Sequence, residues 1–181
     1  MSTLYVDNLQ PNLGSRVMAA GHVVQVVQGT LGSTATGTTS GNTFYDCGLS
    51  ATITPTSSSS KILISYTIHM GTGSYQAKSR IVRDSTVVGI GTQEGSRTGA
   101  SSVSNFYDDN GTTMQYQYQP QGITYLDSPA SSSALTYKIQ VSTYHTVFWS
   151  VNRGYTFQQD TTYGAYDAIP LSVITLMEIA Q

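Results

Sequence analysis

Alternation of apolar and polar residues is the feature that most constrains how this chain can fold. In residues 60–70 the apolar side chains fall mainly on every second position, and residues 114–119 and 135–142 repeat the pattern. Successive side chains of an extended strand point to opposite faces, so a period of two indicates a strand with one buried and one solvated face. The sequence therefore predicts antiparallel β-strands.

Turn-forming residues separate these runs from one another. Asn110-Gly111 favours a tight hairpin, because both central positions of such a turn need positive φ. Short strands separated by Gly, Pro, Ser and Asn are typical of a β-sandwich or barrel. The further candidate strands are residues 22–28, 42–54, 76–83, 86–90, 123–127, 147–152 and 171–180.

Composition agrees with an all-β chain and excludes several function classes. Only 10% of the 181 residues are charged, against about 25% in average soluble domains. The net charge is −2 and the basic residues are scattered in the sequence, so we expect no nucleic-acid partner and no binding to an anionic membrane. No apolar run is long enough to span a bilayer, and a secretory signal pattern is lacking. Cys47 is the single cysteine and has no basic neighbour, so we expect a buried, unreactive thiol.

The first 21 residues differ from the rest of the chain. They show little strand alternation and contain only one short helix-compatible piece, residues 13–20. A helix of this length is marginal alone. We expect residues 1–21 to form an arm that gains order against copies of itself or a neighbouring protein, with a frayed terminus as the alternative. Residues 22–181 would form one β-sandwich.

The last predicted strand is apolar on both faces, and residues 147–149 show the same excess. A strand of this kind must be covered on both sides. Either loops of the same chain cover the second face, or that face is a subunit interface, because monomers rarely expose large apolar patches. The interface candidates are Phe148, Trp149, Leu171, Val173, Ile174 and Leu176.

Catalytic and metal-binding patterns are scarce. No phosphate loop, zinc-ligand pattern or nucleophile-elbow motif occurs. The enzymatic alternative is a polysaccharide depolymerase. Glycoside hydrolysis usually needs two convergent carboxylates, and the best supply is Glu94 with Asp108 or Asp109. Residues 108–111 (Asp-Asp-Asn-Gly) offer oxygen ligands for calcium but lack the ligand spacing of a calcium loop, which favours a polar hairpin tip. We expect no enzyme activity, no cofactor and no metal.

Aromatic residues are frequent in the predicted loops. Exposed Tyr beside Asn, Gln, Asp and Ser offers flat apolar faces with hydrogen-bonding edges, a mixture that suits protein or sugar recognition. The alternative is that several of these rings close the ends of the sandwich. The candidates for receptor binding are Tyr75, Phe106, Tyr107, Asp108, Asp109, Tyr155, Tyr163 and Tyr166.

Four phrases of the sequence carry a resemblance to a known group of proteins. They are residues 4–11 (Leu-Tyr-Val-Asp-Asn-Leu-Gln-Pro), 42–64, 124–129 (Thr-Tyr-Leu-Asp-Ser-Pro) and 174–180 (Ile-Thr-Leu-Met-Glu-Ile-Ala). The second phrase joins two strand-like runs through a Pro/Ser turn. Together these phrases resemble the head domains of bacteriophage tail fibres and related virion proteins, especially those of cyanophages and other marine phages.

The resemblance implies a structural and host-recognition part of a virion and not an enzyme. It implies an all-β jelly-roll sandwich similar to the tumour-necrosis-factor-like trimeric head, assembled as a homotrimer in the host cytoplasm. The arm would join other tail or capsid proteins through Leu4, Tyr5, Val6 and Leu9. The loops of the head would bind a host surface polysaccharide or protein, weakly at each site and with avidity from several copies. The alternative within the virion is a capsid-surface fibre or decoration protein that stabilises the particle.

Overall fold

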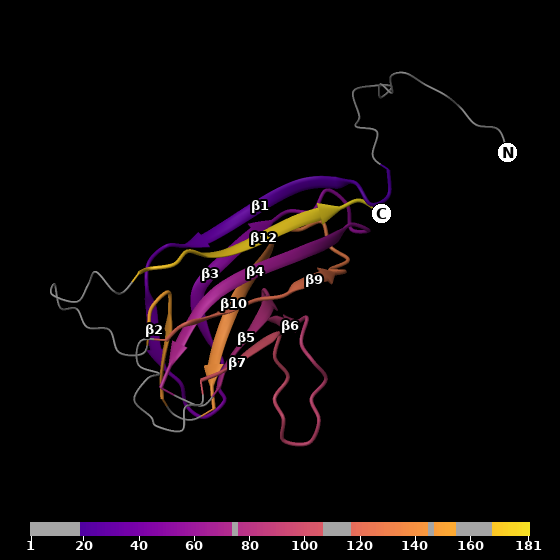
Figure 1. Ribbon diagram of the computed structural model, residues 1–181. Coiled ribbons are helices and arrows are strands. Elements are labelled where there is room, and N and C mark those ends of the chain that lie inside the picture. The colour runs from indigo at the N-terminus through magenta and orange to yellow at the C-terminus, as the bar shows by residue number, and fades with distance from the viewer. Residues whose placement is uncertain (1–18, 74–75, 107–116, 145–146, 155–167) are drawn as a thin grey trace, which may run out of the picture.

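The computed structural model describes residues 19–73, 76–106, 117–144, 147–154 and 168–181. These residues form twelve β-strands and no helix, arranged as two antiparallel sheets that pack face to face (Figure 1). The predicted all-β class is therefore confirmed. The strands are β1 (Val23–Leu31), β2 (Ala35–Thr38), β3 (Tyr45–Ile53), β4 (Lys61–Thr72), β5 (Gln76–Arg83), β6 (Thr86–Val88), β7 (Ser102–Asn105), β8 (Gln119–Gln121), β9 (Thr124–Asp127), β10 (Leu135–Thr143), β11 (Phe148–Val151) and β12 (Ser172–Ile179).

The larger sheet is built around β4, the longest strand. Along one side, β4 pairs with β12 over residues 61–67 and with β11 over residues 70–72. At the sheet edges, β1 pairs with β12 and β2 pairs with β11. On the other side β9 and β8 lie end to end along β4 in one register. The described chain begins beside its own last residues, because the Gly21 amide donates to the Ala180 carbonyl oxygen at 2.8 Å.

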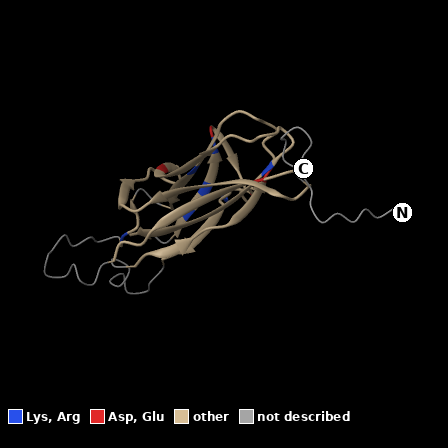
Figure 2. Cartoon of the chain, turned by 90° about the horizontal axis from the view of Figure 1, so that it is seen from above, with Lys and Arg blue, Asp and Glu red and all other residues tan. Residues whose placement is uncertain are grey.

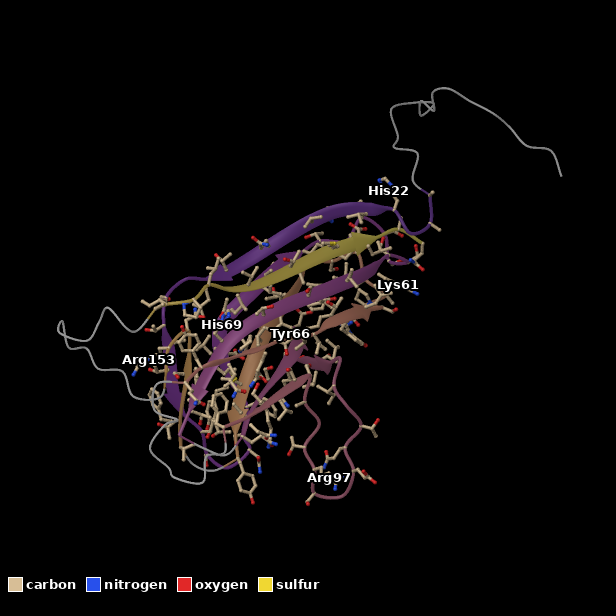
Figure 3. The ribbon with its side chains drawn as sticks, viewed as in Figure 1. His22, Lys61, Tyr66, His69, Arg97 and Arg153 are labelled. Atoms are coloured by element: carbon tan, nitrogen blue, oxygen red, sulfur yellow. The ribbon has the colours of Figure 1, made fainter. Side chains whose placement is uncertain are left out.

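The smaller sheet has the order β3-β10-β5-β6, and β7 also pairs with β5. Val88 of β6 lies opposite Ile81, and Ser102 of β7 lies opposite Ser79, so β6 and β7 pair with consecutive stretches of β5. The two strands act as one edge strand from which residues 89–101 project sideways. Figure 3 labels Arg97 at the tip of this segment, here called the side loop.

The base of the side loop is closed by hydrogen bonds. The Ser101 hydroxyl donates to the Gly89 carbonyl oxygen at 2.8 Å, and the Ser101 amide donates to the Ser79 carbonyl oxygen at 2.8 Å. Gly89 has a φ of 60°, and a Cβ there would lie 2.8 Å from the Tyr125 ring. Only glycine fits this turn, because it tolerates positive φ and leaves room for the ring.

The core lies between the two sheets and follows the predicted alternation. Along β4 the side chains at even positions, such as Ile62 and Ile64, are buried, and the odd positions face outward. The sheets approach each other closely at Gly29, where a Cβ would lie 2.0 Å from the Ser50 carbonyl oxygen. The fully buried large side chains are Leu49, Ile53, Ile62, Ile64, Ile68, Met70, Ile81, Phe106, Tyr137, Ile139, Ile174 and Leu176.

Two buried carboxylates, at the end of the sandwich where the described chain begins, accept hydrogen bonds that join separate strands and turns. Asp127 accepts hydrogen bonds from the Tyr137 hydroxyl at 2.7 Å and from the guanidinium of Arg83, which joins β9 to the opposite sheet. Glu178 accepts from the amide and hydroxyl of Thr56, at 2.8 and 2.7 Å, and from the Gln25 side chain. Thr56 lies in the turn that carries the chain from β3 in one sheet to β4 in the other.

Most predicted strands are present, with shifted ends. The prediction missed β2 and β7 because these short edge strands contain Thr, Ser, Gly and Asn with little apolar alternation. The predicted hairpin at Asn110-Gly111 and most of the predicted arm lie outside the described residues. No helix in the described part of the chain is long and apolar enough to cross a membrane.

Candidate interaction surface

An apolar row crosses the outer face of the larger sheet. Val26 of β1 lies opposite Met177 of β12, Met177 lies opposite Leu63 of β4, and Leu63 lies opposite Leu126 of β9. Side chains directly opposite in an antiparallel pair share a face, so these four residues, here called the apolar row, are neighbours. Val26 and Leu126 are 56% and 45% exposed, and the two central residues are half-buried.

The surface around the apolar row carries almost no charge. Val23 and Ile179 continue it toward the end where the described chain begins, and Lys61 is the only Lys, Arg, Asp or Glu among the outward positions of β1, β4, β9 and β12 (Figure 3). On its other side lies a polar row in which the Gln28 amide donates to the Thr175 hydroxyl at 3.2 Å. A sheet face of this kind is typical of a surface that another protein covers.

The opposite outer face, on the smaller sheet, has a different character. Asp46, Gln140 and Arg80 lie side by side across β3, β10 and β5, joined by hydrogen bonds through the Gln140 amide. Lys138 lies two residues before Gln140 and forms an ion pair with Asp46 at 2.8 Å. Charged residues are sparse in the described chain (Figure 2), yet Asp46, Arg80 and Lys138 lie together on the smaller sheet. This face is suited to solvent or to a polar ligand.

Half of the predicted interface residues are core residues. Trp149, Ile174 and Leu176 are at most 5% exposed and point between the sheets, so their assignment to an interface is wrong. Val173 and Phe148 are half-buried on the outer face, and Leu171 is 54% exposed. The error arose because β12 is apolar on both sides, and its sequence alone does not tell which side faces the core.

The structure adds interface candidates that the sequence prediction missed. Leu63 is the single apolar residue at the outward positions of β4, and Leu126 is placed beside it only by the pairing of β9 with β4. Val26 lies in residues 23–27, which are all Val except Gln25, and this excess of apolar residues over a simple alternation was a usable signal.

One of the predicted receptor-binding residues has a structural role. Phe106 is 1% exposed and belongs to the core, so its assignment to an exposed recognition surface is wrong. It follows β7 at a position where the alternation of that strand points inward. The other candidates, Tyr75, Tyr107, Asp108, Asp109, Tyr155, Tyr163 and Tyr166, and the arm residues Leu4, Tyr5, Val6 and Leu9, lie outside the described residues.

Of the carboxylates considered for catalysis, only Glu94 lies in the described residues, because Asp108 and Asp109 fall outside them. Glu94 lies at the tip of the side loop, where its side chain is 84% exposed and pairs with Arg97 at 3.5 Å. Cys47 is buried, as predicted, and burial raises the pKa of its thiol to about 11. No group of His, Cys, Asp and Glu in the described ranges could hold a metal ion. A shallow depression of about 310 Å³ lies beside β4 and is lined by residues 65–67 and 120–124.

No protein-family model and no curated protein sequence matches this chain. Its function is therefore inferred from the geometry of the two outer sheet faces together with the resemblance described above.

Proposed function

We propose that this chain is the head of a homotrimeric phage tail fibre that recognises the host cell surface. Residues 1–21 would attach the head to the virion, and the loops of the head would contact a host glycan or protein. A capsid-surface fibre or decoration protein is the alternative role for the same assembly.

The observation that carries the trimer is the apolar row on the outer face of the larger sheet. Burial of a half-exposed Val or Leu side chain contributes roughly 1 kcal/mol, so several such residues from each protomer could stabilise an assembly. In a threefold arrangement the apolar faces would turn toward the axis. The charged faces of the smaller sheets would then remain in solvent, which fits the contrast between the two faces.

The strand order supports the jelly-roll part of the proposal. When β8 with β9 and β6 with β7 are each counted as one strand, the main sheets read β1-β12-β4-β9/β8 and β3-β10-β5-β6/β7. Two four-stranded antiparallel sheets whose neighbours come from distant parts of the chain are the arrangement of a jelly roll. Strands β2 and β11 would be additions at one end.

Sedimentation of matched variants tests the trimer. The wild type should sediment as a trimer at micromolar concentration, and Val26→Asp or Leu126→Asp should yield folded monomers. Val103→Asp is the control, because Val103 is similarly exposed, at 47%, but lies on the smaller sheet. A monomeric wild type, or an equal effect of the control substitution, would contradict the proposed interface.

Cell binding separates the two virion roles. A tail-fibre head should bind host cells as a purified trimer and compete with phage adsorption. A decoration protein should bind particles but not cells, and that result would replace the host-recognition role with the alternative.

A further inference from the structure

In the part of the chain that the structure describes, four charged side chains project from the outer face of strands β3, β5 and β10, and three of them are basic. Lys78 and Arg80 lie two residues apart on β5, and Lys138 lies diagonally across from Arg80 on β10. Among these four strand residues Asp46 is the only carboxylate, and it is already paired with Lys138. The local charge is therefore positive on a chain whose net charge is −2.

Lys78 is the most unusual member of this cluster. It is 7% exposed, and its ammonium donates one hydrogen bond, to the side-chain oxygen of Asn42 at 2.6 Å. No carboxylate in the described residues lies within ion-pair distance of Lys78, and burial lowers the pKa of its ammonium. An ammonium has three donors, and a buried charge is costly unless it is paired. A group that supplies negative charge would stabilise this arrangement.

Arg80 is positioned by contacts with two side chains and has no ion pair among the described residues. Its guanidinium carbon lies 4.1 Å from the centroid of the Phe44 ring, and the Gln140 oxygen accepts from Nε at 2.9 Å and from Nη2 at 2.7 Å. The Gln140 amide in turn donates to Asp46 at 2.7 Å, so a neutral side chain separates the cation from the carboxylate. A guanidinium has five N–H donors, and Gln140 uses two of them. The remaining donors are therefore already oriented before a ligand binds.

We propose that this face binds an anionic group of a surface polysaccharide, a carboxylate or a sulfate, with Arg80 as the main contact and Lys78 and Lys138 as flanking charges. Arginine is suited to this role because its planar donors match the oxygens of such anions. This inference rests on the proposed host-recognition role and names the chemistry of its ligand. In the proposed trimer the face would point away from the threefold axis, where a long polymer could reach all three copies.

Binding of purified protein to defined polymers tests the inference. Dextran sulfate, polygalacturonate and uncharged dextran of similar length serve as probes for sulfate, carboxylate and the neutral backbone. Calorimetric titration should show binding to at least one anionic polymer and none to dextran. The affinity should fall when the salt concentration rises from about 50 to about 200 mM, because salt screens exposed charges.

Charge-neutral variants locate the site. Arg80→Gln should weaken binding roughly tenfold or more, because hydrogen bonds to charged groups carry the interaction. Lys78→Met removes the ammonium with little change of volume and should also weaken binding. Arg97→Gln is the matched control, since it removes the same charge from the distant side loop and should leave affinity within about twofold. Thermal melting of each variant shows that the fold is retained.

Several results would overturn the proposal. These are equal binding to uncharged dextran, no binding to either anionic polymer, and loss of affinity in Arg97→Gln as large as in Arg80→Gln. Binding of a single-stranded polynucleotide in place of both polysaccharides, with the same dependence on Arg80, would assign the face to nucleic acid instead. Because the assay uses purified protein, its failure would leave the trimer and cell-binding tests of the proposed function unaffected.

Discussion

Replacing Asp127 tests whether the contact between β9 and the smaller sheet holds the sandwich together. Its carboxylate is buried and accepts from Tyr137 and Arg83, two residues of the opposite sheet. Burial and the neighbouring carboxylate raise the pKa of Tyr137 well above its usual range, so the phenol remains a donor at all ordinary pH values. Asp127→Ala would leave a fully buried hydroxyl and a mostly buried guanidinium without their acceptor.

The expected cost follows from these contacts. Removing one partner of a buried ion pair typically costs about 3–5 kcal/mol, and an unsatisfied buried hydroxyl adds about 1–3 kcal/mol. The Arg83 side chain retains 19% exposure and can reach water, which favours the lower part of the combined range. We therefore expect the free energy of unfolding to fall by about 4 kcal/mol in Asp127→Ala. Tyr137→Phe should lower it by only about 1 kcal/mol, because it removes a single hydrogen bond.

Urea denaturation followed by the fluorescence of Trp149 measures these changes. Trp149 is the only tryptophan and is buried, so its emission should report unfolding of the core. All variants are compared at one protein concentration, because assembly would shift the apparent stability. A loss below about 1 kcal/mol in Asp127→Ala, or strict additivity of Arg83→Met and Asp127→Ala, would refute the reasoning, since residues in direct contact should couple.

Two further predictions concern titratable groups. Burial alone would raise the pKa of Glu178, but hydrogen bonds from Gln25, Thr56 and Ser60 outweigh it and hold the pKa below its usual 4.5. The unfolded state then binds protons more readily, so the stability that Glu178 contributes is present above pH 4.5 and is lost as the pH falls through the lower folded value. Acid titration of unfolding should show a smaller loss over this range in Glu178→Gln, and an unchanged titration would argue against the assignment. Cys47, with a pKa of about 11, should react with a thiol reagent at pH 8 only as fast as the protein unfolds, and rapid reaction of the native protein would contradict its burial.

The alternation of residues was sufficient to predict the long strands. β4 and β10 each have one apolar and one polar side, which fixes both their structure and the face that is buried. β12 is different, because Val173 and Met177 on one side are as apolar as Ile174 and Leu176 on the other. Its inward face is decided by its register with β4, a long-range pairing that no local pattern contains.

Phe106 shows how one missed strand changes a functional prediction. Without β7, an aromatic residue between Asn and Tyr has the composition of a recognition loop. Once residues 102–105 are paired with β5, Val103 and Asn105 face outward and the next residue faces inward, into the core. A short edge strand of Ser, Val and Asn has too weak an apolar pattern for this to be read from the sequence.

The phrases that carry the resemblance coincide with buried polar contacts. Asp127 lies in residues 124–129, Glu178 in 174–180, and its partner Thr56 in 42–64. These residues hold connections between strands and between sheets. The basic residues of the proposed binding face lie outside these phrases, on β5 and β10.

Changes of length or sequence in the side loop should have little effect on folding of the sandwich. Its two ends are fixed on neighbouring positions of β5, and the Ser101 hydroxyl closes the gap between them. The entropy of closing a loop grows only with the logarithm of its length, so doubling the loop would cost about 0.6 kcal/mol. Insertions between residues 91 and 99 should therefore be tolerated by the sandwich. This edge of the sandwich can accept changes of length and sequence, and it is a practical position for displaying a foreign peptide.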